Sequence, residues 1–449
     1  MGLTDGFLKE IENLFSNEIP AHVYRRAKIA LLDYMAVTVA GAASHADKLE
    51  AYLREVNPES GEIAAIGMKR KFTLKESVFL NGLNSHALDM DDGVNQGIIH
   101  LGAPIFSVLL PLAQKYQVTA EKLFKAVIIG YEAAFTIAIS IQPLHKELGY
   151  HATGTCGVLG IALAVSYLLD FAEKERKNAF AAASVSATGV LNVLDDGSEL
   201  KPYNVAKSAL LGLISCQMAK GGFAGPPDPL GGERGFLKMM TCGQNTVLKA
   251  PYFEGRYAIE KTYTKPYAAC RYCHPAIEAS VNISSKHKIK LENIESVEVR
   301  TYSWAVNKHD HIDIPSPASA KMSIPYGVAI GLILGRAGMS EYNAQNIEDP
   351  DILRLLPKIR VVPDDALTDI FPERTVAIVK VQTKDGSQFI ERIDHPKGEP
   401  ENSLTNEEFE QRFIDLFIFG GRTEKAARNM LDDVINMSLG QVFDNEKIN

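Results

Sequence analysis

The segment from residue 265 to 275, with the sequence KPYAACRYCHP, brings three basic side chains into one short stretch. Lys265 and Arg271 are suited to holding carboxylates, arginine as a two-pronged donor and lysine as a point charge. His274 titrates near neutral pH and can move a proton. Pro266 and Pro275 favour a rigid loop over the middle of a helix. A solvated surface turn is the simpler interpretation, but the tyrosines, cysteines and alanines here are typical of a half-buried segment, so we favour a site.

A second candidate segment, residues 85–104, carries Asp89, Asp91 and Asp92 and then His100. The helix dipole disfavours carboxylates at the end of a helix, so their placement needs a reason. Magnesium binding is one reason, but the spacing lacks the further oxygen ligands of a calcium loop, and on a helix Asp91 faces away from Asp89. We therefore predict no metal site, and expect these carboxylates to orient basic side chains or to hold the loop.

Four further residues stand where helices are expected to begin. His151 and Thr153 precede an apolar helix, whose free backbone N–H groups and threonine hydroxyls can bind an anion. Lys201 lies on a loop that leads into another helix and can point inward. Tyr326 opens a helix in the second half of the chain and offers a phenol as an acid. Loop and element-end positions of this kind are expected to converge on one site.

The composition limits the class of protein. A chain of 449 residues is too long for one hydrophobic core, so we expect two domains. A net charge of −8 gives no electrostatic support for nucleic-acid binding. The longest apolar stretch near the start, residues 29–43, is interrupted by Asp33 and predicts a buried helix that is too short for a membrane span. We expect no nucleic-acid or membrane partner.

Five cysteines in a long chain indicate reduced thiols and a cytoplasmic protein, and the amphipathic residues 1–16 lack the pattern of a secretory signal. Cys270 and Cys273 have no nearby second pair that a zinc site needs and no third cysteine for an iron–sulfur cluster. We interpret both as packing residues. With no nucleotide-binding loop either, no cofactor is expected.

The elements that must position these residues change in type near residue 260. Before it, apolar periodicity predicts helices over residues 20–41, 72–87, 104–116, 120–141, 154–171, 174–187 and 204–220. After it, alternation predicts strands over 294–302, 358–362, 375–383 and 388–393, the last two joined by a turn at 384–386, with helices over 325–337 and 343–356. Helices return over 405–417 and 423–436. The expected fold is mainly α, with a discontinuous all-helical domain at 1–260 and 396–449 and a smaller α+β lid at 261–395.

In order along the chain, the motifs ALDMDD at 87–92, HATGT at 151–155, GFAGP at 222–226, KPY and RYCHP between 265 and 275, and SIPY at 323–326 resemble those of the MmgE/PrpD family. The resemblance runs nearly end to end. The family includes 2-methylcitrate dehydratase, cis-aconitate decarboxylase and iminodisuccinate epimerase. The resemblance implies a homodimer with no cofactor and with a site between a helical domain and a lid. The chain departs from the family pattern at Gly93 and Leu101, which leaves the substrate open.

The resemblance therefore implies a cofactor-independent lyase acting on a small di- or tricarboxylate, by decarboxylation of a cis-aconitate-like or dehydration of a 2-methylcitrate-like substrate. An epimerase of an iminodisuccinate-like dicarboxylate is the alternative, and a non-catalytic carboxylate-binding protein the weaker one. The expected catalytic residues are His100, His151, Lys201, Lys265 and Tyr326, and the expected substrate-binding residues are Asp89, Thr153, Arg271 and His274. We expect Lys265→Ala and His100→Ala each to cut turnover about a hundredfold without unfolding the protein.

Overall fold

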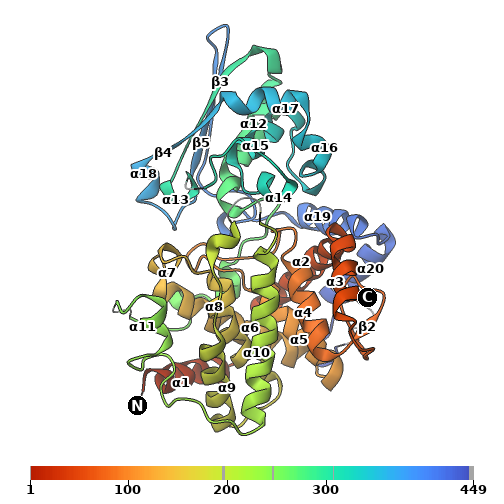
Figure 1. Ribbon diagram of the computed structural model, residues 1–449, viewed down its shortest axis with the longest axis vertical. Coiled ribbons are helices and arrows are strands. Elements are labelled where there is room, and N and C mark those ends of the chain that lie inside the picture. Colours follow the sequence, from red (N-terminus) through yellow and green to blue (C-terminus); the bar gives the residue numbers. More distant parts are fainter. Residues whose placement is uncertain (1, 195–197, 245–246, 307, 444–449) are drawn as a thin grey trace.

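The computed structural model describes residues 2–194, 198–244, 247–306 and 308–443. Figure 1 shows two parts, a large group of helices below and a sheet with its own helices above. We call them the helical part, which holds α1–α11, α19 and α20, and the sheet part, which holds α12–α18 and β3–β6. The prediction of a mainly α fold is confirmed.

The helical part follows the apolar periodicity of the sequence. Its first helices are α1 (Leu3–Ser16), α2 (Ala21–Ser44), α3 (Ala46–Val56), α4 (Leu74–Ser85), α5 (Gly102–Tyr116), α6 (Ala120–Ile141), α7 (Leu144–Glu147), α8 (Ala152–Leu168), α9 (Glu173–Ser186), α10 (Lys201–Lys220) and α11 (Phe236–Met240). A two-residue pair, β1 (Ile63–Ala64) and β2 (Lys71–Phe72), lies beside α4. At the centre, α8 packs between α6 and α10. Gly160 allows the close approach to α6, because a Cβ there would lie 2.6 Å from the Gly130 carbonyl oxygen.

Two helices, α2 and α6, are long and apolar enough to cross a membrane by length and composition. The prediction of a buried helix at residues 29–43 is confirmed, although the helix that holds them, α2, runs over 24 residues and is longer than that apolar stretch. Most of the apolar windows of α2 and α6 lie inside the protein, 78% and 89% buried respectively. Burial of that extent is typical of core helices.

The sheet part contains a four-stranded sheet in the order β4 (Ile359–Pro363), β3 (Ile294–Thr301), β5 (Ala377–Thr383) and β6 (Gln388–Ile393). The predicted hairpin is confirmed as the antiparallel β5–β6 pair, while β3 and β4 run parallel. Helices α12 (His274–His287) and α15 (Ile324–Leu334) contact its strands and each other. The smaller helices are α13 (Ser303–Val306), α14 (Pro317–Ala320), α16 (Ala344–Ile347), α17 (Pro350–Leu355) and α18 (Asp365–Thr368).

One helix predicted over residues 343–356 is wrong, because the chain forms α16 and α17 instead. Pro350 lacks a backbone N–H and cannot continue a helix that begins earlier. It stands instead at the first position of α17, where the Asp349 carboxylate accepts from the N–H groups of Asp351 and Ile352.

The last helices, α19 (Asn406–Phe419) and α20 (Glu424–Ile435), pack on α2 from the opposite end of the chain (Figure 1). Arg412 on α19 ties three segments together. Its Nη1 lies 2.5 Å from Oδ1 of the buried Asp33 on α2, its Nε donates to the Lys265 carbonyl at 2.6 Å, and its Nη2 donates to the Met90 carbonyl at 2.9 Å. The backbones around Met90 and Lys265 are thereby held side by side.

Replacing Arg412 with methionine is expected to lower the free energy of unfolding by about 3 kcal/mol, because Asp33 then keeps a buried charge without its partner. Urea unfolding followed by circular dichroism measures the loss. Arg428→Met on α20, whose partner Glu424 is as exposed as Arg428 itself, is the control and should change stability by less than about 1 kcal/mol. Equal effects of the two substitutions would contradict the proposed role of Arg412.

Candidate active site

A cavity of about 80 Å³ lies between the helical part and the sheet part. The helical part contributes residues from the loop after α4, from α7 and from the starts of α8 and α10. The facing wall comes from residues 263–272 and Phe371. The charged, imidazole and thiol side chains that line the cavity are Asp89, His100, Lys146, His151, Lys201, Lys265, Cys270 and Arg271.

Asp89 joins the two walls through two ammonium groups. Its Oδ2 lies 2.6 Å from Lys201 Nζ and its Oδ1 lies 2.7 Å from Lys265 Nζ. Lys201 is the first residue of α10 rather than part of the preceding loop, and Lys265 Nζ also donates to the Asp89 carbonyl at 2.6 Å. Burial raises the pKa of Asp89, but the two lysines outweigh it and hold that pKa well below its usual range. The carboxylate is therefore ionised and fixes both cations in the cavity wall.

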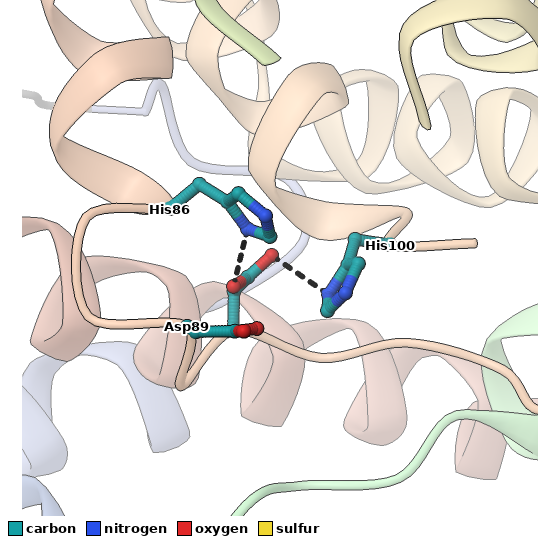
Figure 2. Close-up of side chains that lie close together, drawn as sticks. His86, Asp89 and His100 are labelled. Atoms are coloured by element: carbon teal, nitrogen blue, oxygen red, sulfur yellow. Dashed lines mark hydrogen bonds and ion pairs between the residues drawn. The ribbon is translucent and has the colours of Figure 1, made fainter. Parts of the chain in front are cut away.

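Asp91 holds two imidazoles in the same way. Its Oδ1 lies 2.7 Å from His86 Nδ1 and its Oδ2 lies 3.0 Å from His100 Nδ1. In Figure 2 the rings of His86 and His100 face the carboxylate that lies between them, and dashed lines mark the two contacts. His100 Nδ1 is also 2.8 Å from the Asp92 carbonyl oxygen, which can only accept, so Nδ1 carries the proton. His100 Nε2 is then left with a lone pair in a ring that lines the cavity.

His86, Asp89, Asp91 and His100 also have the spacing of a metal site, with one ligand atom from each within 4.8 Å of the others. The argument that Asp91 faces away from Asp89 on a helix is wrong, because α4 ends at Ser85 and Asp89 has a φ of 54° in the turn that follows. The local chemistry nevertheless fits a cation poorly. The Nδ1 atoms of both histidines donate to acceptors, and two ammonium groups already neutralise Asp89.

The start of α8 also opens on the cavity. His151 precedes its first residue, Ala152, and both line the cavity. Burial, followed by the neighbouring His86 and Lys201, keeps the pKa of His151 well below its usual range, so this imidazole is neutral. Thr153 supports the site from behind, since its Oγ1 accepts from the His100 backbone N–H at 3.0 Å. A substrate carboxylate here would meet the positive end of the α8 dipole.

On the facing wall, Arg271 lines the cavity but is already paired. Its Nη2 lies 2.5 Å from Glu399 Oε1, and its guanidinium stacks 4.6 Å from the centre of the Tyr263 ring. His274 does not line the cavity. Its Nδ1 accepts from Arg271 Nη1 at 3.0 Å while its Nε2 donates to the Ala269 carbonyl at 3.1 Å. His274 therefore braces Arg271 in this structure.

Tyr326 lies outside the cavity lining. It is fully buried in α15, and its hydroxyl donates to the Glu341 carbonyl at 3.0 Å. Of the nine predicted site residues, the structure thus brings Asp89, His100, His151, Lys201, Lys265 and Arg271 to the cavity, whereas Thr153, His274 and Tyr326 lie outside its lining. Lys265 is itself 0% exposed, so we no longer expect Lys265→Ala to leave stability unchanged.

Two residues that line the cavity were not predicted as site residues from the sequence. Lys146, on the one-turn helix α7, lies over the rings of Tyr272 and Trp304 and hydrogen-bonds the Tyr272 hydroxyl. No carboxylate among the described residues pairs with it, and burial lowers its pKa to about 8. Cys270 was interpreted as a packing residue, which is wrong because it lines the cavity, whereas Cys273 is buried as expected.

Taken together, the cavity offers held cations, a histidine with a free ring nitrogen and a helix start. Cations of this kind hold carboxylates and stabilise negative charge that develops next to them. A histidine with a free lone pair takes or gives a proton. The arrangement is suited to proton transfer at a carbon beside a carboxylate.

The family assignment agrees with this chemistry. Family models described as the MmgE/PrpD N-terminal domain and the MmgE/PrpD C-terminal domain match residues 8–249 and 267–435, so the chain belongs to the MmgE/PrpD family.

Among individual relatives, a cis-aconitate decarboxylase of Aspergillus terreus is 25% identical over 97% of this chain and 92% of its own length. The cis-aconitate decarboxylase of Mus musculus is 21% identical over 92% of this chain and 86% of its own. A 2-methylcitrate dehydratase of Salmonella typhimurium is 26% identical, over 64% of this chain and 61% of its own.

Stability is expected to fall as the pH is lowered from about 6.5 toward 4. Burial lowers the pKa of His86 and His145 to about 4, and it also lowers the pKa of His151 and His274. In the unfolded chain these imidazoles protonate near 6.5, so below that pH the unfolded state binds more protons, at about 1.4 kcal/mol per proton and pH unit. Asp92 opposes them, because burial raises its pKa to about 6, and burial also raises the pKa of Asp33, Glu132 and Glu278. His45, whose pKa burial lowers, acts with the other histidines, and in the unfolded chain all of these imidazoles protonate at a higher pH than the carboxylates do, so their effect comes first as the pH falls.

Urea midpoints measured at pH 7.5, 6.0 and 5.0 at constant salt test this expectation. The midpoint should fall steadily across the series. A midpoint that stayed constant or rose toward pH 5 would show that these histidines are not buried in the neutral form.

Proposed function

We propose that this protein is a cofactor-independent lyase that acts on a small di- or tricarboxylate, with decarboxylation of a cis-aconitate-like substrate as the leading reaction. The observation that carries the proposal is the cavity itself, because Lys146, Lys201 and Lys265 line it together with His100, whose Nε2 is left with a lone pair. The relatives named cis-aconitate decarboxylase also match this chain nearly end to end.

The roles follow from which cations are free. Lys146 has no carboxylate partner among the described residues and is the anchor for a substrate carboxylate. Lys201 and Lys265 share the single charge of Asp89, so together they keep a surplus of positive charge for an enolate-like intermediate. His100 Nε2 takes or returns the proton, and the neutral His151 offers a second ring on the same wall.

Proton NMR in deuterated water tests the proposal on cis-aconitate, 2-methylcitrate and iminodisuccinate. Loss of carbon dioxide from cis-aconitate with one deuterium in the product is the expected result. An alkene formed from 2-methylcitrate would select the dehydratase, and exchange at a stereocentre of iminodisuccinate without net loss would select the epimerase. Binding of all three without turnover would reject an enzymatic function on these carboxylates.

Replacing Lys146 with methionine is expected to raise KM for the carboxylate substrate about tenfold and to leave kcat within about threefold. A contact that holds substrate and transition state equally contributes to KM and not to kcat. Lys48→Met, at a surface ion pair with Glu199, is the matched control and should change neither constant. A large loss of kcat with unchanged KM would contradict the anchoring role.

A further inference from the structure

Cys270, on the wall of the cavity that faces His100, pairs with His309, which lies outside the cavity lining. Cys270 Sγ lies 4.0 Å from His309 Nε2. On the other side of the ring, His309 Nδ1 is 2.7 Å from the Met322 carbonyl oxygen, which can only accept, so Nδ1 carries the proton and Nε2 presents its lone pair to the thiol. A nucleophile, a base and a group that orients the base are thus in series.

The pair is fixed by its surroundings. The Cys270 backbone N–H donates to the Lys321 carbonyl at 2.8 Å, and Met322, which orients His309, is the next residue. Tyr272 stacks edge-on against the His309 ring at 5.5 Å. Cys270 lines the cavity and is held there from both sides, while Cys273, one turn on, is fully buried in the core.

The charges around Cys270 favour a thiolate. The titratable and charged groups that act on it or feel its charge are His309, Lys201, Lys146, Asp89, Cys273, Tyr272 and Tyr302. Burial raises the pKa of Cys270, but His309 and then Lys201 outweigh it and bring that pKa down to about 6. Burial raises the pKa of the core thiols Cys156 and Cys216 instead, to about 12 for Cys156.

We infer that Cys270, with His309 as its base, is a second catalytic proton-transfer group of this cavity, acting on the carboxylate substrate from the wall formed by residues 263–272. The inference rests on the proposed function. The thiolate takes a proton from the carbon beside a substrate carboxylate, so that an S–H bond forms, the C–H bond breaks, and the electron pair passes into that carboxylate beside the lysines. In a decarboxylation no proton is removed first, and the thiol form acts: the bond from carbon to the leaving carboxylate breaks, carbon dioxide departs, and the electron pair left on carbon takes the thiol proton. His309 then passes a proton from water to the thiolate. His100 and His151 serve the opposite wall.

The state of the thiol is tested without any substrate, by alkylation with iodoacetate and iodoacetamide followed by peptide mass spectrometry. At pH 7, iodoacetate should modify Cys270 at least ten times faster than the exposed Cys242, although Cys270 is the less accessible thiol. The rate at Cys270 should reach half its maximum near pH 6. In His309→Gln the rate at Cys270 should drop about tenfold. A rate at Cys270 that rises only above pH 8, or no reaction in the folded protein, would overturn the inference.

The catalytic role is tested with Cys270→Ser and Cys270→Ala, against Cys242→Ser as control. Both Cys270 variants should lose about a hundredfold in kcat and in the rate of deuterium uptake next to the carboxylate, with unchanged urea midpoints. Cys242→Ser should stay within twofold. Normal turnover in both Cys270 variants would reject the catalytic role even if alkylation shows a thiolate. Should the unmodified protein turn over none of the three carboxylates, the proposed function and with it this role would fail, while alkylation would still decide whether the thiolate pair exists.

Discussion

Asp89→Asn is expected to lower the free energy of unfolding by about 3–5 kcal/mol and to cut turnover at least about a hundredfold. The asparagine keeps the shape of the side chain but removes the charge that the ammonium groups of Lys201 and Lys265 share, at 2.6 and 2.7 Å. Lys265 is buried and Lys201 is half-buried, and the two ammonium groups would repel each other without this charge. Urea unfolding measures the first loss and steady-state kinetics the second.

A double variant separates charge from shape. In Asp89→Asn combined with Lys201→Met one of the two unbalanced cations is gone, so part of the lost stability should return while activity stays low. If the single variant were as stable as the original protein, or if the double variant were the less stable of the two, the ion pairs would not have the importance given to them here.

His100→Gln is expected to reduce kcat by about a hundredfold to ten-thousandfold, the range for removal of a general acid or base. Glutamine can still donate to the Asp92 carbonyl, as His100 Nδ1 does at 2.8 Å, but it has no ring nitrogen that can take a proton. Because the ring lines the cavity and not the core, the urea midpoint should change little.

The matched control is His22→Gln, at a surface histidine whose side chain is 59% exposed and pairs with Glu260. It should keep the original rate. Retention of kcat within twofold in His100→Gln, with the protein folded, would remove His100 from the mechanism and transfer the proton step to the remaining groups of the cavity.

Most of the fold could be predicted because its signals are local. The alternation of residues over 294–301 predicts strand β3, and the turn before Gln388 predicts the β5–β6 hairpin. The Thr119 cap starts α6 where the apolar periodicity begins. The helices needed no knowledge of their partners to be recognised. The ends were less accurate, and the helix predicted over residues 343–356 overlooked a local signal, the proline at 350 that begins α17.

The site was predictable only where the side chain follows from the backbone. The Asp89 loop was taken as helical, but the chain leaves the helix at Ser85, and that turn places Asp91 beside Asp89. Tyr326 opens α15 as expected, yet its place on the helix turns the hydroxyl toward Glu341. Lys146 on its one-turn helix carries no periodic signal, and only packing against the far wall brings it to the cavity.

The three contacts of Arg412 constrain the order in which a newly synthesised chain can fold. The ribosome delivers Asp33 early, and its partner follows 379 residues later, after both walls of the cavity have been synthesised. Until then the nascent chain has a carboxylate that belongs in the core but lacks its cation, and burying it alone costs several kcal/mol. The carbonyl groups of Met90 and Lys265 also lack this hydrogen-bond donor until Arg412 has been synthesised. The cavity is therefore completed only after translation has passed Arg412 on α19.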